Sequence, residues 1–175
     1  MEELIDVLNE DGTKTGKVVT RKEVHEKGLW HRIVVIAIID KEGHLLMQQR
    51  SKYVKTNPEK WDISAAGHVS AGQTSREAAI REIKEEVGLE IKQEELTYIT
   101  TYSEPTRKQG DIIDNQFFDF YIVIKPKIEM ESIHIQESEV ENVKLCDLEE
   151  VKDKLENNMV IKRDIVYKEI LQYLK

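Results

Sequence analysis

Three glutamates in one short segment are the residues of this chain best suited to chemistry. Glu85 and Glu86 follow Glu82 by three and four residues, so on a helix all three share one edge, within an arc of roughly 100°. Carboxylates crowded in this way repel one another unless a cation lies among them. Hard divalent ions such as Mg²⁺ take carboxylate and carbonyl oxygens, usually together with substrate phosphates. The spacing therefore suggests a magnesium site.

The same segment allows a plainer interpretation, a solvated helix face held by ion pairs. Glu77 and Arg81, and Arg81 and Glu85, stand four residues apart and could pair along a helix. For an arbitrary glutamate-rich helix this interpretation is the more common one. The residues that precede the helix favour the metal site instead.

A strand and a glycine loop are expected directly before the acidic helix. Residues 61–66 have the pattern of a short strand, and residues 67–73 form a tight loop with two glycines. Thr74 or Ser75 is a suitable N-cap for the helix, and Gly88 suits its C-terminus. Such a loop can direct a backbone carbonyl toward the point that the carboxylates face.

This combination resembles the signature of the Nudix hydrolases, G-x5-E-x7-R-E-U-x-E-E-x-G-U, where U is a bulky aliphatic residue. Gly67 matches the first glycine, and residues 81–89 match the remainder in register. Gln73 departs from the pattern, because the family has its first glutamate there. The resemblance implies an α/β (α+β) fold, the Nudix α/β/α sandwich with a mixed sheet. It also implies hydrolysis of a nucleoside diphosphate linked to another group.

The resemblance assigns roles to five residues. Glu82 and Glu86 are expected to be the principal ligands of Mg²⁺, with Mn²⁺ as an alternative. Glu85 is expected to be a further ligand or to orient the attacking water, and the Gly67 carbonyl to be a backbone ligand. Arg81 is expected to hold the glutamates in place, which makes Arg81, Glu85 and Glu86 the catalytic candidates.

Gln73 is the weak point of the match. Its amide cannot ionise, so it brings no charge to a metal site. Its oxygen could still accept a hydrogen bond from Arg81. We expect the substitution to affect the rate more than the class of reaction.

Other parts of the chain are similar to the isopentenyl-diphosphate isomerase branch of the family. The similarity lies in residues 28–32, in residues 45–50 and in an expected N-terminal β-hairpin. The isomerases need a cysteine on the strand before the glycine loop, and residues 63–66 contain none. Hydrolysis is therefore favoured over isomerisation. A nucleotide-binding module without catalysis is a third alternative, to which Gln73 lends some support.

Weaker site candidates lie outside the acidic helix. Arg50 could meet a substrate phosphate, because a guanidinium suits bidentate phosphate contact. His68 is a further substrate-binding candidate, although a histidine in such a loop is more often exposed to solvent. His31 and Arg32 are expected to be structural. An additional base could come from one of five acids: Glu104, Asp111, Asp114, Glu137 and Glu139.

The whole chain, residues 1–175, is expected to form a single Nudix domain. Residues 1–28 would be an N-terminal hairpin extension, and residues 67–89 the signature segment. Alternation and apolar stripes predict the remaining elements. The expected strands are 30–40, 44–50, 96–103, 115–125 and 142–145, and the expected helices are 147–156 and 162–174. Residues 21–27 are expected to form a short helix or a turn.

Composition narrows the classes of partner and compartment. The net charge of −8 disfavours general binding to nucleic acid or to an anionic membrane. An acidic protein that binds a polyanion needs metal ions or local basic residues, which agrees with a nucleotide or another diphosphate as substrate. Cys146 is the single cysteine, so a reducing cytoplasm is expected. A homodimer through the hairpin or the sheet is possible by analogy of fold.

Overall fold

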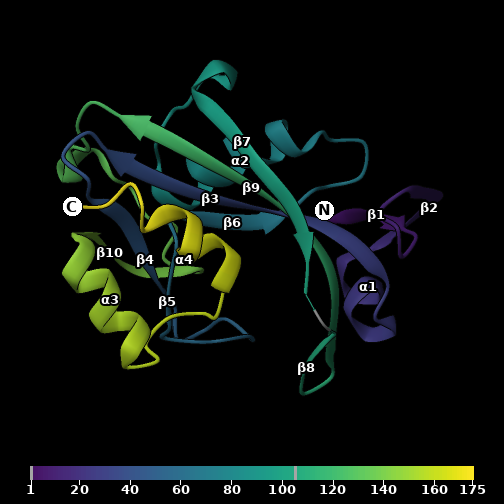
Figure 1. Ribbon diagram of the computed structural model, residues 1–175. Coiled ribbons are helices and arrows are strands. Elements are labelled where there is room, and N and C mark those ends of the chain that lie inside the picture. Colours follow the sequence, from purple (N-terminus) through teal and green to yellow (C-terminus); the bar gives the residue numbers. More distant parts are fainter. Residues whose placement is uncertain (1, 105) are drawn as a thin grey trace.

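A mixed β-sheet with helices on both faces forms the body of the protein. The computed structural model describes residues 2–104 and 106–175 (Figure 1). Two strands in the middle, β3 (Trp30–Asp40) and β9 (Ile112–Lys125), run parallel, and the other pairings are antiparallel. The strand order is β10 (Val140–Cys146), β4 (Leu45–Arg50), β3, β9, β7 (Leu96–Ser103).

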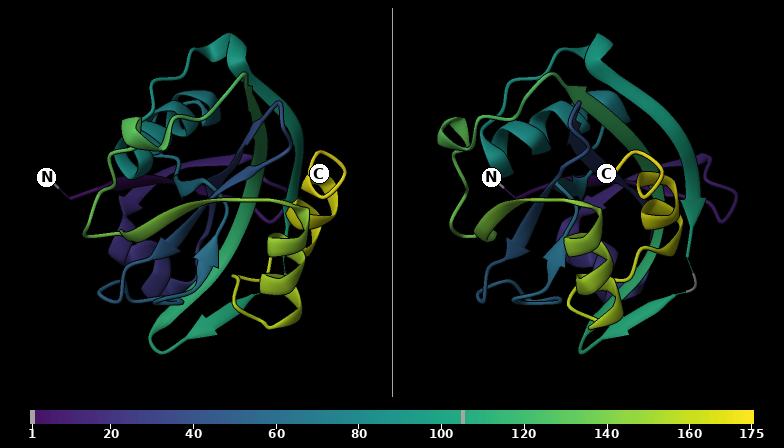
Figure 2. Two further views of the ribbon diagram at one scale, coloured as in Figure 1. Left: turned by 90° about the vertical axis from the view of Figure 1, so that its left-hand side faces the viewer. Right: turned by 60° about the vertical axis from the view of Figure 1, so that its left-hand side comes forward.

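The alternation of β3 divides the apolar interior into two layers. Residues 33, 35, 37 and 39 face a core shared with α3 (Leu148–Glu156) and α4 (Asp164–Ile170). Residues 34, 36 and 38 face a core shared with α2 (Ser75–Val87). Both faces of a strand bury apolar side chains only when both faces of the sheet are covered. Figure 2 shows this arrangement, which confirms the predicted α/β/α sandwich.

The predicted N-terminal hairpin is present. Strands β1 (Leu4–Leu8) and β2 (Lys14–Thr20) form a separate antiparallel sheet. Helix α1 (Arg21–Lys27) follows and ends at Gly28, which adopts the left-handed conformation. A small apolar cluster joins these elements through Ile5, Val7, Val19 and Val24.

Helix α2 begins and ends where its capping residues predict. Thr74 is the N-cap, and its hydroxyl accepts from the Glu77 amide while the Glu77 carboxylate accepts from the Thr74 amide. This reciprocal pair satisfies two of the free donors at the helix start. Gly88 has a φ of 73° and closes the helix, so the glutamates of this helix have a fixed register.

The strand predicted for residues 61–66 is in fact two short strands. β5 (Trp61–Asp62) pairs with β4, whereas β6 (Ala65–His68) pairs with β3. Ser64 stands at the break, where its hydroxyl accepts from the Ile38 amide and donates to the Leu46 carbonyl. The side chain thus replaces backbone pairing where β3 and β4 diverge.

This split moves the glycine of the signature out of a loop. Gly67 and His68 belong to β6, whereas the sequence placed both in the glycine loop. The connection to α2 is correspondingly shorter than the predicted 67–73 segment. Gly67 is therefore held by strand pairing, opposite Val34 on β3.

Some elements were not predicted. The strand β8 (Arg107–Gln109) pairs with an extension of β9, which starts at Ile112 rather than residue 115. Their hairpin projects beyond the sheet in Figure 1. Polar, charged sequence masks the strand signal there. Two 3₁₀ turns, Gln93–Glu95 and Met130–Ser132, complete the order of elements.

Across residues 2–104 and 106–175, no helix is both long and apolar enough to cross a membrane.

A buried ion pair joins β5 to the start of α4. Nε and Nη2 of Arg163 each lie 2.8 Å from an oxygen of Asp62. Asp62 is fully buried and Arg163 is 6% exposed. A paired arrangement with two charge-assisted hydrogen bonds offsets the cost of burying both charges. The pair fixes the C-terminal helix against the sheet.

We predict that Arg163→Met lowers the free energy of unfolding by about 3–5 kcal/mol, because Asp62 then remains buried without its partner. Urea denaturation would measure the change. Lys162→Met is the matched control, since the Lys162 side chain is 82% exposed. The control should shift the free energy by no more than about 0.5 kcal/mol. A fully stable Arg163→Met variant would contradict the importance of the pair.

Candidate active site

Helix α2 brings its three glutamates to one side of a cleft, as their spacing predicts. Glu82 is 7% exposed and Glu86 is 2% exposed, whereas the Glu85 side chain is 49% exposed. Glu82 and Glu85 line the cleft together with Gly67. Two buried carboxylates on one helix face are costly unless a cation or hydrogen bonds compensate for them.

Gly67 allows Glu82 to lie directly against the strand backbone. A Cβ atom at position 67 would stand 2.0 Å from the carboxyl carbon of Glu82 and 2.1 Å from its Oε1. A side chain at position 67 would displace the end of the flexible Glu82 side chain. The glycine therefore permits this close approach and leaves the Glu82 carboxylate beside the strand backbone.

Glu86 lies deeper than Glu82. Its Oε2 accepts hydrogen bonds from Nε2 of Gln48, at 2.7 Å, and from the Ala66 amide, at 3.1 Å. Burial and the nearby charge of Glu82 raise the pKa of Glu86 well above its usual range. Burial likewise raises the pKa of Glu82 to about 7, although Arg81 opposes the shift.

These carboxylates form a suitable environment for a divalent cation. Raised pKa values mean that the site holds more negative charge than the protein alone stabilises. The available donors are carboxylate oxygens and the backbone of β6, which are the hard ligands that Mg²⁺ and Mn²⁺ prefer. Glu82, Glu85, Glu86 and Gly67 are thus the residues fitted to hold such an ion.

Arg81 connects this site to two elements. Its Nη1 lies 2.8 Å from Glu82 and 2.9 Å from Glu85, and its Nη2 donates to the His68 carbonyl at 2.7 Å. The side chain therefore ties two glutamates of α2 to β6. This geometry fits the positioning role expected from the sequence.

The predicted hydrogen bond between Gln73 and Arg81 is wrong. The Gln73 amide oxygen instead accepts from the Ser70 amide at 3.3 Å. Among the described residues, the buried Nε of Arg81 has no hydrogen-bond partner. An amide offers a single acceptor oxygen, which here is used within the loop. The substitution at position 73 thus leaves one donor of Arg81 unsatisfied.

Basic residues from several elements surround the acidic site. The cleft has a volume of about 1320 Å³, which is large for a small-molecule site. The carboxylates of α2 lie on one side of the cleft, and basic side chains lie around them. This arrangement suits a polyanion that binds partly through metal ions held by the carboxylates. Its basic lining includes Arg21, Lys22, Arg50, Lys55, Arg107 and Lys108.

Arg50, a predicted substrate contact, lies at the end of β4 in this lining. Its Nε and Nη2 donate to the Thr56 carbonyl at 3.2 Å and 3.1 Å. The β4–β5 loop therefore fixes the guanidinium in place at the wall of the cleft. The contact with phosphate stays a prediction.

The five acids considered as an additional base occupy different places. Asp111, Asp114 and Glu139 line the cleft, and Glu104 pairs with Arg107. Only Glu139 among them contributes to raising the pKa of both Glu82 and Glu86. Its backbone is held at the start of β10, since the Ser51 amide donates to the Glu139 carbonyl at 2.8 Å. Of the candidate acids, Glu139 is thus the one best placed to act together with Glu82 and Glu86 of α2.

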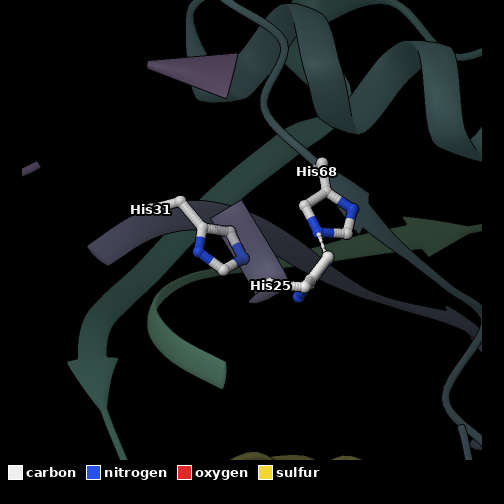
Figure 3. A group of neighbouring side chains, drawn as sticks. All are labelled: His25, His31 and His68. Atoms are coloured by element: carbon white, nitrogen blue, oxygen red, sulfur yellow. Dashed lines mark hydrogen bonds between the residues drawn. The ribbon is translucent and has the colours of Figure 1, made fainter. Parts of the chain in front are cut away.

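A cluster of three histidines lies in the same cleft region and was not predicted. His25 comes from α1, His31 from β3 and His68 from β6, and one nitrogen of each lies within 4.8 Å of the others (Figure 3). His25 and His68 are 3.1 Å apart through their Nε2 atoms. The expectation of a solvent-exposed His68 is wrong, because the residue is 7% exposed.

Neighbouring groups orient two of these rings. His31 uses Nδ1 toward the Leu29 carbonyl, at 2.9 Å, and His25 uses Nδ1 toward Asp114, at 2.7 Å. A carboxylate or carbonyl behind an imidazole is the usual support of a metal-binding histidine. Burial lowers the pKa of His31 to about 4 and that of His68 well below its usual value. Both rings are therefore neutral at pH 7, the form that binds metals.

Sequence reasoning missed this cluster because its members come from separate elements. The pairing of β3 with β6 places His68 opposite Ile33, two residues from His31, and α1 then supplies His25. No cysteine lines the cleft among the described residues. Cys146 is fully buried in the core.

Comparison with known proteins identifies the class of this molecule. The NUDIX domain model matches residues 29–168. An uncharacterised Nudix hydrolase of Clostridium acetobutylicum is 35% identical over 161 residues, covering 90% of this chain and 76% of that protein. The chain therefore belongs to the Nudix family. It is a Nudix hydrolase, of the class that cleaves pyrophosphate bonds with divalent metals.

Further relatives agree with this assignment. Nudix hydrolase 3 of Arabidopsis thaliana is 38% identical over 169 residues, covering 95% of this chain but 21% of that protein. Isopentenyl-diphosphate Delta-isomerase of Serratia proteamaculans is 32% identical, covering 77% of this chain and 74% of that protein. The predicted likeness to the isomerase branch is thus confirmed. In fold, DR0079 of Deinococcus radiodurans matches with a TM-score of 0.69 and 19% identity, covering 99% of this chain and all of that one.

We predict that Gln73→Glu stabilises the protein by about 1–2 kcal/mol. A carboxylate has two acceptor oxygens, so one can keep the Ser70 amide while the other accepts from Nε of Arg81. Thermal and urea unfolding would measure the gain. Gln93→Glu adds the same charge at an exposed position and should leave stability unchanged. A loss of stability on Gln73→Glu would show that position 73 does not reach Arg81.

Proposed function

We propose that this protein is a Mg²⁺-dependent hydrolase that cleaves a pyrophosphate bond in a nucleoside di- or triphosphate or a related nucleoside diphosphate derivative. Nucleotide sugars and ADP-ribose are the next candidate substrates. A ligand of that kind carries several negative charges and a sizeable leaving group, and the basic lining and volume of the cleft accommodate both. A solved Nudix domain from Shewanella oneidensis, 14% identical, is complexed with ADP ribose.

The observation that supports this proposal most is the Arg81-held pair of glutamates facing Gly67. Arg81 contacts Glu82 and Glu85 at 2.8 Å and 2.9 Å, and the Glu82 carboxylate lies against the backbone of Gly67. Ion binding at this point needs little rearrangement of the chain. When bound there, divalent ions neutralise the pyrophosphate and activate the attacking water.

The protein's own residues then supply position and proton transfer. Arg81 keeps Glu82 and Glu85 oriented toward β6, and Gln48 holds Glu86. The Thr56 carbonyl fixes Arg50 through its Nε and Nη2 atoms. The other N–H groups of the guanidinium can then donate to a phosphate oxygen. The attacking water loses a proton as its oxygen forms the new P–O bond, and the bridging P–O bond of the pyrophosphate breaks, with the bridging oxygen leaving on the other phosphate.

Glu139 is our choice for the group that accepts this proton, with Glu85 as the alternative. Glu139 lines the cleft from the β10 side and acts electrostatically on Glu82 and Glu86. Carboxylates of aspartate and glutamate are common general bases in enzymes.

The histidine cluster adds a second place for a metal. The neutral rings of His31 and His68, together with His25 held by Asp114, favour a transition ion such as Zn²⁺ over Mg²⁺. We propose that this ion complements the Mg²⁺ at the acidic helix. The two sites draw on different elements but border one cleft, because Arg81 joins the glutamates to the His68 carbonyl.

Isomerisation of isopentenyl diphosphate is the alternative that the Serratia relative suggests. That reaction moves a proton on carbon and needs a donor and an acceptor there. Ala65 and Ala66 occupy the strand beside Glu86, where the isomerases carry a cysteine. Assaying isopentenyl diphosphate for dimethylallyl diphosphate and for phosphate release separates the two reactions. A module that binds nucleotides without turnover would give neither product.

We predict that Glu86→Gln lowers Mg²⁺-dependent release of phosphate or nucleoside monophosphate by more than about 100-fold, because groups that only support a metal ligand already contribute 10–100-fold. A screen of nucleotides and diphosphates with phosphate detection provides the assay. Glu90→Gln is the control, since Glu90 is 82% exposed and pairs only with Lys84. Full activity in Glu86→Gln would show that the assigned site is wrong.

We predict that His68→Gln weakens Zn²⁺ binding at least about ten-fold and leaves Mg²⁺ binding unchanged, because the cluster loses one of three nitrogens. Isothermal titration of the chelator-treated protein measures both ions. His134→Gln removes a solvent-exposed histidine and should bind Zn²⁺ as the unaltered protein does. Equal Zn²⁺ affinity in all three proteins would argue against a histidine site.

A further inference from the structure

Strand β1 of the N-terminal hairpin runs along the turn that joins β6 to α2. Ile5 forms an antiparallel bridge with Ser70, and the Ala71 amide donates to the Leu4 carbonyl at 2.7 Å. The hydroxyl of Ser70 also donates to Glu3 at 3.1 Å. The turn of residues 70–73 is therefore paired with a strand from another part of the chain.

Asp6 makes the side-chain contact at the tip of this turn. Its Oδ2 accepts from the Gly72 amide at 3.1 Å and lies 2.7 Å from Nζ of Lys14. Gly72 has a φ of +80°, a conformation that few other residues adopt. Asp6 is thus held by β2 while it fixes the one left-handed residue of the turn.

The turn lies between the two halves of the ion site. Gly67 precedes the turn on β6, and Thr74, the N-cap of the helix that carries the glutamates, follows it directly. The Glu82 carboxylate rests against Gly67 with no room for a methyl group. A small shift of the turn would therefore change the distance between the β6 backbone and the carboxylates.

We infer that Asp6 is a positioning residue of the ion site, acting through Gly72, and that strand β1 is a working part of the site. The family match begins at residue 29, so it does not include this strand. The inference rests on the proposed function only in requiring that the acidic helix binds a divalent ion. Its mechanism is preorganisation, because a fixed turn spares the cost of ordering the ligands on binding.

The test is the affinity for Mn²⁺, measured by isothermal titration and by the paramagnetic resonance of the free ion, without substrate. Asp6→Ala removes the acceptor for Gly72 and should weaken Mn²⁺ binding about ten-fold, as expected for a lost hydrogen bond to a charged group. Asp6→Asn keeps an acceptor oxygen and should restore most of the affinity. Asp11→Ala is the matched control, since Asp11 lies in the same hairpin and its carboxylate accepts from Thr13.

Each outcome has a defined meaning. Weakened binding in Asp6→Ala, with affinity recovered in Asp6→Asn and unchanged in Asp11→Ala, supports the inference. Unchanged binding in Asp6→Ala overturns it while leaving the proposed function intact. Should Asp6→Ala unfold the hairpin, Ser70→Ala removes only the contact with Glu3 and should still weaken binding. A lack of Mn²⁺ binding in the unaltered protein would instead overturn the proposed function.

Discussion

Crowding of carboxylates on one face of α2 is the constraint on which the site depends. Burial raises the pKa of Glu82 and Glu86, and the closest compensating charge is the single guanidinium of Arg81. One cation cannot balance three acids, so the folded chain carries a local excess of negative charge. A divalent ion removes that excess, and the same ion attracts a polyanionic substrate into an otherwise acidic protein.

The sheet and the packed face of α2 hold these mutually repelling carboxylates in place. Strand β6 is paired with β3 in the middle of the sheet, and α2 packs its apolar side onto the same sheet. Ser64 separates β5 from β6, so that β6 can leave β4 and align Gly67 with the helix. The sandwich thus fixes strand and helix independently, and the short turn between them sets their relation.

Three contributions from outside the signature segment complete the cleft. The N-terminal elements bring His25 and the contacts of β1, the end of β4 brings Arg50, and the approach to β10 brings Glu139. Each lies on an element separate from the acidic helix, so only the packing of the elements brings it to the cleft.

The sequence by itself determined the acidic helix and its caps, because these follow from spacing within one segment: three glutamates lie on one edge, with Thr74 and Gly88 at the ends. The layered fold was expected from the family resemblance and not from the spacing of residues. Only the tertiary structure decided which distant residues meet. It placed Gly67 on a strand, buried His68 beside His25 and His31, and left Nε of Arg81 without Gln73. Local periodicity carries no information about strand register or about the direction of a side chain across the cleft, and these properties arise only when the elements pack.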